Sequence, residues 1–259
     1  MESSDFKRIE KAKKLAAGPL GEHMSKFPLR FTKAVFFGER PSRKKTTRIN
    51  NGTITLVNLG KGPIAMTCAH VISAYRKMIE ELDNVIFQVG DVALDPIAQL
   101  IAEDTKLDLA SIELTEEQVK SVTADGEIGS CVFEPVSWPP PTLKPGDFVA
   151  LGGFPGGLRE LPAHDEIVQG SWSCGGASVT TIDENRFSCQ FEREYWVSPF
   201  GAEHHLELRD LGGMSGGPAF IHRDLYWDFV GIIYEFSPSF DIMYLRSARV
   251  VNADGSFRS

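Results

Sequence analysis

The chain has 259 residues, 42% of them hydrophobic, which is enough to bury a sizeable core in one domain or in two closely packed lobes. Its formal net charge of −8 argues against a nucleic-acid binder, which usually carries a clustered basic excess. Because residues 1–10 lack the apolar run of a secretory signal and no later run approaches membrane-spanning length, we expect a cytoplasmic protein without a membrane span. The four cysteines lack the spacing of a zinc site or a disulfide framework.

The N-terminal part is expected to be a helical extension, residues 1–28. Between residues 4 and 17 apolar side chains recur at helical intervals opposite a row of lysines, which predicts a short amphipathic helix. Residues 18–28 are interpreted as a connector to the globular body. The helix either packs on the end of a barrel or docks on a membrane or a partner, and its role stays open.

Residues 29–125 are predicted to form a first β-barrel lobe. Turns at 51–52 and 59–63 separate short apolar segments typical of strands, and apolar residues at helical intervals follow His70. Many short strands joined by glycine and proline turns favour a barrel. The expected strands lie at 31–37, 53–58, 64–68, 85–89, 97–102 and 109–114.

Residues 126–259 are predicted to contain a crossover and a second β-barrel lobe. The stretch 115–142 is polar and turn-rich, and the prolines that follow Trp138 exclude a regular helix or a central strand there. A short closing turn or helix is expected at 247–251. The expected strands begin at 148 and continue near 166–172, 177–182, 186–192, 218–222, 229–236 and 242–245.

A glycine-rich loop around Ser215 is the strongest candidate for a catalytic element. In Leu211-Gly-Gly-Met-Ser-Gly-Gly-Pro-Ala-Phe220, four glycines surround one serine. A serine that attacks a carbonyl needs an exposed hydroxyl and backbone N–H groups aimed at the oxyanion that forms, and Gly213 and Ser215 offer two such groups. The alternative is a glycine-rich turn in which glycine only permits positive φ.

A serine nucleophile also needs a base and an acid that orients the base. His70 follows a short apolar strand, and Asp108 directly precedes another, so these residues are the candidate base and acid. Asp104 is a rival acid, but it lies in a polar turn. The candidates follow one another along the chain in the order His, Asp, Ser.

These stretches resemble the His, Asp and Ser signatures of trypsin-like, chymotrypsin-fold serine proteases. Thr67-Cys-Ala-His70 is similar to the family's Thr-Ala-Ala-His, Asp108-Leu-Ala110 to its Asp-aliphatic-Ala, and Gly213-Met-Ser-Gly-Gly-Pro218 to its Gly-x-Ser-Gly-Gly-Pro. The turn-rich stretch Lys144–Gly157 resembles bacterial members. The resemblance implies two six-stranded antiparallel β-barrels with few helices, and a serine endopeptidase that needs no metal or cofactor and acts on polypeptides.

Two residues depart from the family pattern. Secreted members place an acid before the nucleophile to pair with an N-terminus created by activation cleavage, and Met214 stands at that position here. We therefore expect a loop that is preformed, or ordered by substrate or by an activating protein partner. Val71 replaces the cysteine that usually follows the histidine, which favours a reducing compartment.

The resemblance also implies where substrate would bind. The strand segment Tyr234, Glu235 and Phe236 would lie along the substrate backbone, and Arg209 and Asp210 would lie near the primary pocket. A charged residue in the pocket predicts a preference for a substrate side chain of opposite charge.

Three other functions stay open as alternatives. A catalytically weak or inactive binding or scaffold protein can share the fold, since fold does not determine function. A non-peptide ester hydrolase shares the acyl-enzyme chemistry, and a nucleic-acid binder is disfavoured by charge. His204 and His205 do not indicate a metal site, because adjacent residues of an extended chain point to opposite faces.

Overall fold

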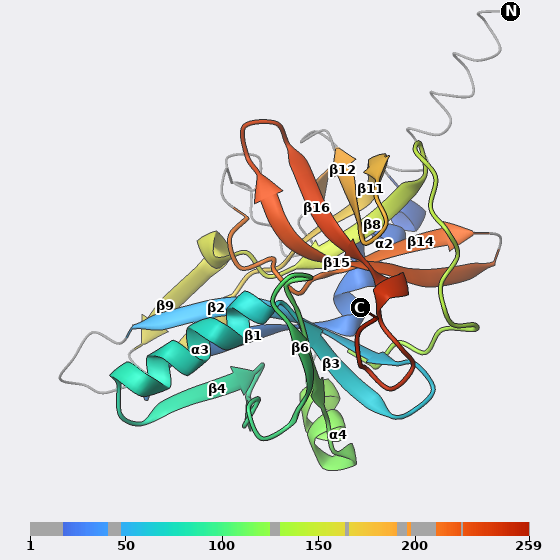
Figure 1. Cartoon of the computed structure of the whole chain (residues 1–259). Coiled ribbons are helices and arrows are strands. Elements are labelled where there is room, and N and C mark those ends of the chain that lie inside the picture. Colours follow the sequence, from blue (N-terminus) through green and yellow to red (C-terminus); the bar gives the residue numbers. More distant parts are fainter. Residues whose placement is uncertain are drawn as a thin grey trace, which may run out of the picture.

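The computed structural model describes residues 18–40, 48–124, 130–163, 166–190, 196–197, 211–223 and 225–258. Most of this chain lies in two large antiparallel sheets, the first in the lower part of Figure 1 and the second in the upper part. The helix predicted at 4–17 lies outside the described residues.

The first sheet has seven strands in the order β5-β4-β1-β2-β3-β7-β6 and is curled. Its central strands β1 and β2 are buried along most of their length, which suits their β-branched and aromatic side chains. The strands are β1 (Thr32–Glu39), β2 (Ile49–Asn58), β3 (Pro63–Thr67), β4 (Val85–Val89), β5 (Val92–Leu94), β6 (Leu100–Asp104) and β7 (Leu109–Glu113).

The second sheet closes into a six-stranded barrel, because β12 pairs with both β16 and β11. With the curled first sheet, this barrel confirms the predicted all-β fold with few helices. The short strand β13 pairs with Ser173 and Cys174 near the start of β11. The strands are β8 (Phe148–Gly153), β11 (Trp172–Ile182), β12 (Arg186–Gln190), β13 (Trp196–Val197), β14 (Pro218–Arg223), β15 (Tyr226–Ser237) and β16 (Ile242–Ser247).

The helix predicted after His70 is α3 (Ala69–Glu81), which lies over the first sheet in Figure 1. Its buried side chains, among them Val71, Ile72, Tyr75 and Met78, recur at helical intervals and enter the core of that lobe. The short helix predicted near the C-terminus is the 3₁₀ turn η5 (Ala248–Val250).

Two segments form helices that the sequence analysis did not predict. The expected connector at 18–28 forms helix α2 (Pro19–Lys26), which has proline in its first turn, followed by the 3₁₀ helix η1 (Phe27–Phe31). The stretch expected to be turns after residue 115 forms helix α4 (Glu116–Ala124), where Gln118 N donates to the Thr115 hydroxyl at 3.2 Å.

The strand expected near 166–172 forms β10 (Glu166–Gln169), whereas its partner β9 (Arg159–Ala163) was not predicted. The two strands follow the 3₁₀ turn η2 (Gly156–Leu158) and pair as a hairpin, which forms a separate two-stranded sheet. Arg159 ties the hairpin to the first lobe by donating to Ile49 O at 3.1 Å.

The interior is continuous from one lobe to the other. Phe27 and Phe31 of η1 join Phe133 and Phe220 in an aromatic cluster whose ring centroids lie 4.8 to 5.4 Å apart. Phe27 also stacks on Trp227 of β15 at 4.1 Å.

In the described part of the chain, no helix is long and apolar enough to cross a membrane. The boundaries at residues 28 and 125 stay predictions.

Candidate active site

His70 and Asp108 meet because the strands that precede or follow them are paired. His70 lies in the first turn of α3, directly after β3, and Asp108 lies directly before β7. β3 and β7 run antiparallel with Thr67 opposite Ala110, so the end of one strand faces the start of the other. Asp108 adopts a left-handed backbone conformation with φ of 53°, which turns its side chain toward the helix.

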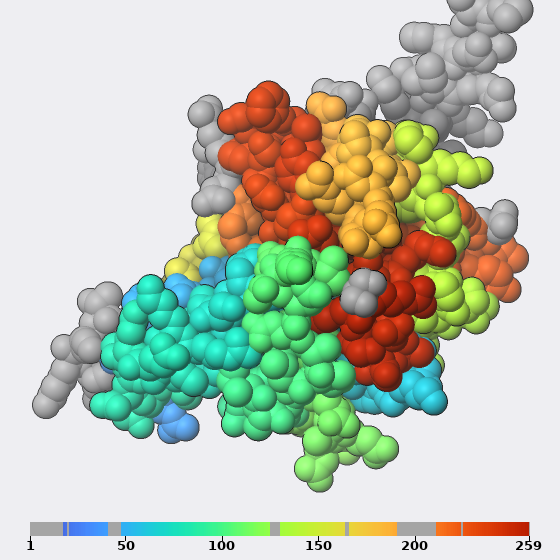
Figure 2. All heavy atoms as spheres, viewed as in Figure 1, coloured from blue at the N-terminus to red at the C-terminus, as the bar shows by residue number. Residues whose placement is uncertain are grey.

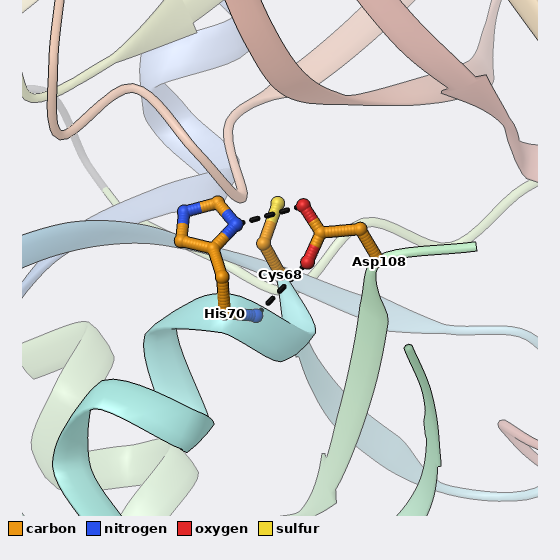
Figure 3. A group of neighbouring side chains, drawn as sticks. All are labelled: Cys68, His70 and Asp108. Atoms are coloured by element: carbon orange, nitrogen blue, oxygen red, sulfur yellow. Dashed lines mark hydrogen bonds and ion pairs between the residues drawn. The ribbon is translucent and has the colours of Figure 1, made fainter. Parts of the chain in front are cut away.

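The Asp108 carboxylate holds His70 at two points (Figure 3). One oxygen lies 2.7 Å from His70 Nδ1, and the other accepts a hydrogen bond from the His70 backbone N–H at 2.9 Å. The first N–H groups of a helix lack partners within the helix, so this carboxylate satisfies one of them and interacts with the positive end of α3. A proton on Nδ1 leaves Nε2 of the neutral ring as an acceptor, which is the tautomer that a general base needs.

Asp104 makes different contacts. Its Oδ1 accepts hydrogen bonds from Lys106 N at 2.8 Å and Leu107 N at 2.9 Å, which closes the turn between β6 and β7. Asp104 is therefore a turn residue, and Asp108 is the carboxylate that the fold places against His70.

The loop at residues 211–218, called the nucleophile loop after the role expected of Ser215, is held through its carbonyl groups. Every carbonyl from Leu211 to Gly217 accepts a hydrogen bond from the protein. Because a peptide unit is planar and trans, fixing a carbonyl also fixes the N–H group of the next residue. The donors, in order along the loop, are Met214 N, Gly156 N, Thr53 Oγ1, Gly217 N, Thr53 N, Thr55 Oγ1 and Ile233 N.

The amides of Gly213 and Ser215 differ from those of their neighbours Met214, Gly216 and Gly217. Within the described residues, neither amide N–H donates to a protein acceptor, whereas those of Met214, Gly216 and Gly217 do. Two free N–H groups on a backbone whose carbonyls are all occupied match the geometry that an oxyanion hole needs. Gly213 has φ of +98°, and a Cβ there would lie 2.9 Å from Gly156 N, so glycine is required.

Met214 is packed into the core of the second lobe. Its side chain is 1% exposed and belongs to the same apolar cluster as Leu211, Ala219 and Ile233. Its sulfur lies so close to Gly153 that a Cβ on that glycine would be only 2.8 Å away. The loop is thus anchored by burial at the position where the family has an ion pair.

Ser215 lies beside a buried thiol that the sequence analysis did not assign to the site. Cys68 is fully buried and its Sγ lies 3.3 Å from Ile233 O. Burial raises the pKa of Cys68 well above its usual value, the Asp108 charge adds to the rise, and contacts that include the Ser215 side chain oppose it. In the described structure no hydrogen bond joins Ser215 to His70, and a proton transfer between them needs Oγ and Nε2 within hydrogen-bonding reach.

Cys68, His70 and Asp108 form one group with metal-ligating atoms, all within 4.8 Å of one another. However, Nδ1 of His70 and the carboxylate of Asp108 are already bonded to each other, and the thiol is buried in its neutral form. This arrangement fits a proton-transfer pair better than a metal site.

The predicted substrate-binding residues fall into two groups. Tyr234, Glu235 and Phe236 continue β15 immediately after Ile233, whose backbone pairs with Gly216 and Gly217 of the nucleophile loop. The pairing of β15 with β14 ends at Ile232, whereas its pairing with β16 continues beyond Ile233. Arg209 and Asp210, like His204 and His205, lie outside the described residues.

Three residues that contribute to the site were not predicted. Thr53 and Thr55 of β2 donate to the nucleophile loop across 160 residues or more of sequence, and nothing local distinguishes them from other strand threonines. Arg246 of β16 lies over the ring of Tyr234 at 4.2 Å and donates to Lys106 O at 3.2 Å, close to Asp108.

Comparison with known proteins gives weak but consistent likenesses. No protein-family model matches the chain, and no curated protein matches it in sequence. The active form of the Rv3671c protease from M. tuberculosis is 15% identical with a TM-score of 0.44, over 89% of this chain and 82% of that one. The thermostable serine protease AL20 from an extremophilic microorganism is 13% identical with a TM-score of 0.46, over 84% and 91%.

The inactivated protease paralogue S-I1 of the scabies mite is 12% identical with a TM-score of 0.45, over 87% of this chain and 91% of that one. These three structures are thus two proteases and an inactivated protease paralogue. Likenesses at this level do not assign an activity, which has to be argued from the geometry of the site.

Proposed function

We propose that the chain is a serine endopeptidase that cleaves polypeptides through His70, Asp108 and Ser215. The observation that carries the proposal is the junction of the two lobes. There the bonded His70–Asp108 pair of the first lobe meets a rigid loop of the second lobe that presents Ser215 and two free amides.

The arrangement supports acyl transfer in two stages. Ser215 Oγ attacks the peptide carbonyl while Nε2 of His70 accepts its proton and then passes it to the leaving amine. Asp108 keeps the proton on Nδ1 and stabilises the imidazolium. The N–H groups of Gly213 and Ser215 bind the oxyanion, and water then hydrolyses the acyl-enzyme by the same proton transfers in reverse.

A peptide substrate suits the strand next to the serine. β14 pairs with β15 only as far as Ile232, beside the nucleophile loop, and an extended peptide can add to the edge of a strand. We propose that Tyr234, Glu235 and Phe236 bind the substrate backbone and that Arg209 or Asp210 selects a charged side chain. Narrow-specificity proteolysis in the cytoplasm is the role we infer for such a site.

The first test is labelling of the full chain with a fluorophosphonate probe, alongside Ser215→Ala and His70→Ala variants. We expect an adduct on Ser215, located by mass spectrometry, that is absent from Ser215→Ala and strongly reduced in His70→Ala. Asp104→Asn serves as a matched control for Asp108→Asn, and only the second should slow labelling. An unlabelled wild type would favour the binding or scaffold alternative.

A second test separates a peptidase from an esterase. A peptide library should be cleaved by the wild type and spared by Ser215→Ala, with preferred sites dominated by one charged residue. Turnover of simple esters with no cleavage in the library would support an ester hydrolase. A profile dominated by large apolar residues would contradict the proposed roles of Arg209 and Asp210.

A further inference from the structure

One buried residue of the first lobe, Thr53, contacts the nucleophile loop through both its side chain and its backbone. The Thr53 hydroxyl donates to Gly213 O at 2.7 Å and accepts from Phe154 N at 3.0 Å. The Thr53 backbone N–H donates to Ser215 O at 3.0 Å. Its carbonyl accepts from the hydroxyl of Thr67, on the strand that leads to His70, at 2.8 Å. Thr53 therefore touches the loop, the turn at 154–156 and the strand that carries the base.

The direction in which the Gly213 N–H points depends on the turn at 154–156. Gly156 N donates to Gly212 O at 2.6 Å, and in a planar trans peptide the N–H of Gly213 then points the opposite way. Both residues that flank this peptide are glycines, so no Cβ opposes its rotation. The bonds that keep the turn against the loop must therefore hold the N–H in place.

The Thr53 hydroxyl joins these two segments directly. It accepts from the first residue of the turn and donates to the carbonyl of Gly213, the residue whose N–H must stay oriented. Met214 has no charge with which to order the loop by an ion pair; its burial anchors the loop on the core of the second lobe, whereas the Thr53 hydroxyl bonds the loop to the turn at 154–156. An unsatisfied hydroxyl at this site would be costly, since Thr53 is fully buried.

We propose that Thr53 is a positioning residue for the oxyanion hole, and that its hydroxyl replaces the activation-dependent ion pair as the device that orders the loop. The inference rests on the proposed function, because an oxyanion hole has meaning only for an acyl-transfer enzyme. The hydroxyl acts through the peptide units of Gly212–Gly213 and Gly213–Met214 and does not touch the substrate.

Thr55 offers a matched control. It lies two residues further along β2, is equally buried, and donates its hydroxyl to Gly216 O at 2.6 Å. Its bond lies beyond Ser215 and does not reach the turn at 154–156. Thr53→Val and Thr55→Val remove the same group from the same strand, and Thr53→Ser keeps the hydroxyl.

The experiment measures the rate of fluorophosphonate labelling and the amide hydrogen exchange of the peptide covering 154–158. Deleting an oxyanion-hole donor outright slows acyl transfer by about 10²–10³-fold, so misorienting one in Thr53→Val should slow labelling by roughly ten- to a hundredfold. Thr53→Ser should stay close to the wild-type rate, and Thr55→Val should lose much less than Thr53→Val. Faster exchange of the Phe154 and Gly156 amides should appear in Thr53→Val alone.

Equal losses in the two valine variants, or a Thr53→Ser variant as slow as Thr53→Val, would overturn the proposal. Unchanged exchange at 154–158 in Thr53→Val would overturn it whatever the labelling rate. If the wild type does not react with the probe while exchange rises in Thr53→Val alone, the proposed function fails and the positioning of the loop by Thr53 stands. Thermal unfolding of each variant shows that the compared proteins are folded.

Discussion

At the scale of single residues, the nucleophile loop combines rigidity with two unsatisfied donors. Both residues that carry them are half-buried, and an N–H that loses water without gaining an acceptor costs free energy, so such groups suit a position that a ligand will occupy. Gly213 and Ser215 sit on a backbone whose carbonyls are fixed by three separate segments of the chain. The loop is therefore organised before a substrate arrives, and the oxyanion would find its donors already oriented.

Met214 lets us test how that loop is anchored. Because the side chain packs among apolar residues, Met214→Asp places a charge in the core of the second lobe, at a cost of about 3–5 kcal/mol, the scale of an unpaired buried charge. Met214→Leu conserves volume and should cost less than about 1.5 kcal/mol. Urea denaturation of both variants measures the free energy of unfolding. A Met214→Asp variant as stable as the wild type would mean that the loop finds a cationic partner.

The buried cysteines of the second lobe predict how stability changes at high pH. Burial raises the pKa of Cys174 from 9.0 to about 11, and it also raises the pKa of Cys189. The unfolded chain releases these protons first, so the stabilisation is complete below about pH 9 and is lost as pH rises toward 11. We expect the free energy of unfolding to fall over that interval. The fall should be smaller in Cys174→Ala, and an identical fall would contradict this assignment.

At the scale of elements, the N-terminal helices α2 and η1 join the first lobe to the second. α2 contacts β11 and β8, and η1 contacts β8 and β14, so residues that precede the first lobe pack on the second. Polar residues with glycine and proline predicted a connector at 18–28. The 3₁₀ helix η1 forms there because Phe27 and Phe31 pack in an aromatic cluster whose other rings come from distant parts of the chain.

Substitution of Phe27 tests how much the packing of η1 on the second lobe stabilises the fold. Phe27→Ala removes a ring that stacks on Trp227 and meets Phe31 and Phe220 edge-on, and a buried Phe→Ala change costs about 3–5 kcal/mol. Phe240→Ala is the matched control because its side chain is 69% exposed, so its effect should stay within about 0.5 kcal/mol. Chemical denaturation compares the two, and equal losses would show that the cluster does not stabilise the fold.

The strands and the His70–Asp108 pair were accessible from sequence, because both follow from local patterns. Short apolar segments bounded by turn residues predict strands, and the order of the motifs predicts which side chains meet. Helix α4 was missed because a polar surface helix carries a weak apolar period, with Val122 its one buried residue. Thr53, Thr55 and Arg246 could not be found in this way, since their partners are set by the packing of one lobe on the other.

At the scale of the whole molecule, the ordered loop predicts that activity does not depend on N-terminal cleavage. Donors from β2, from the turn at 154–156, from β15 and from the loop itself already bond its carbonyl groups. No carbonyl of the loop is therefore left for a new N-terminus to bond. The full chain and a chain shortened by residues 1–17 should react with a fluorophosphonate probe at the same rate. Labelling seen only in the shortened chain would show that the N-terminal segment is inhibitory.

The end of the chain returns to the lobe with which it began. After β16, Val250 and Val251 enter the core shared with the first sheet, and Ser111 of β7 donates to Gly255 O at 2.7 Å. Figure 2 shows these last residues against the surface of the segment near residue 100. The first lobe thus takes part of its interior from residues that follow the second barrel, while α2 and η1, which precede the first lobe, pack on strands of the second. Neither lobe completes its packing from its own stretch of sequence, so a site at their junction requires segments from both ends of the described chain to be folded together.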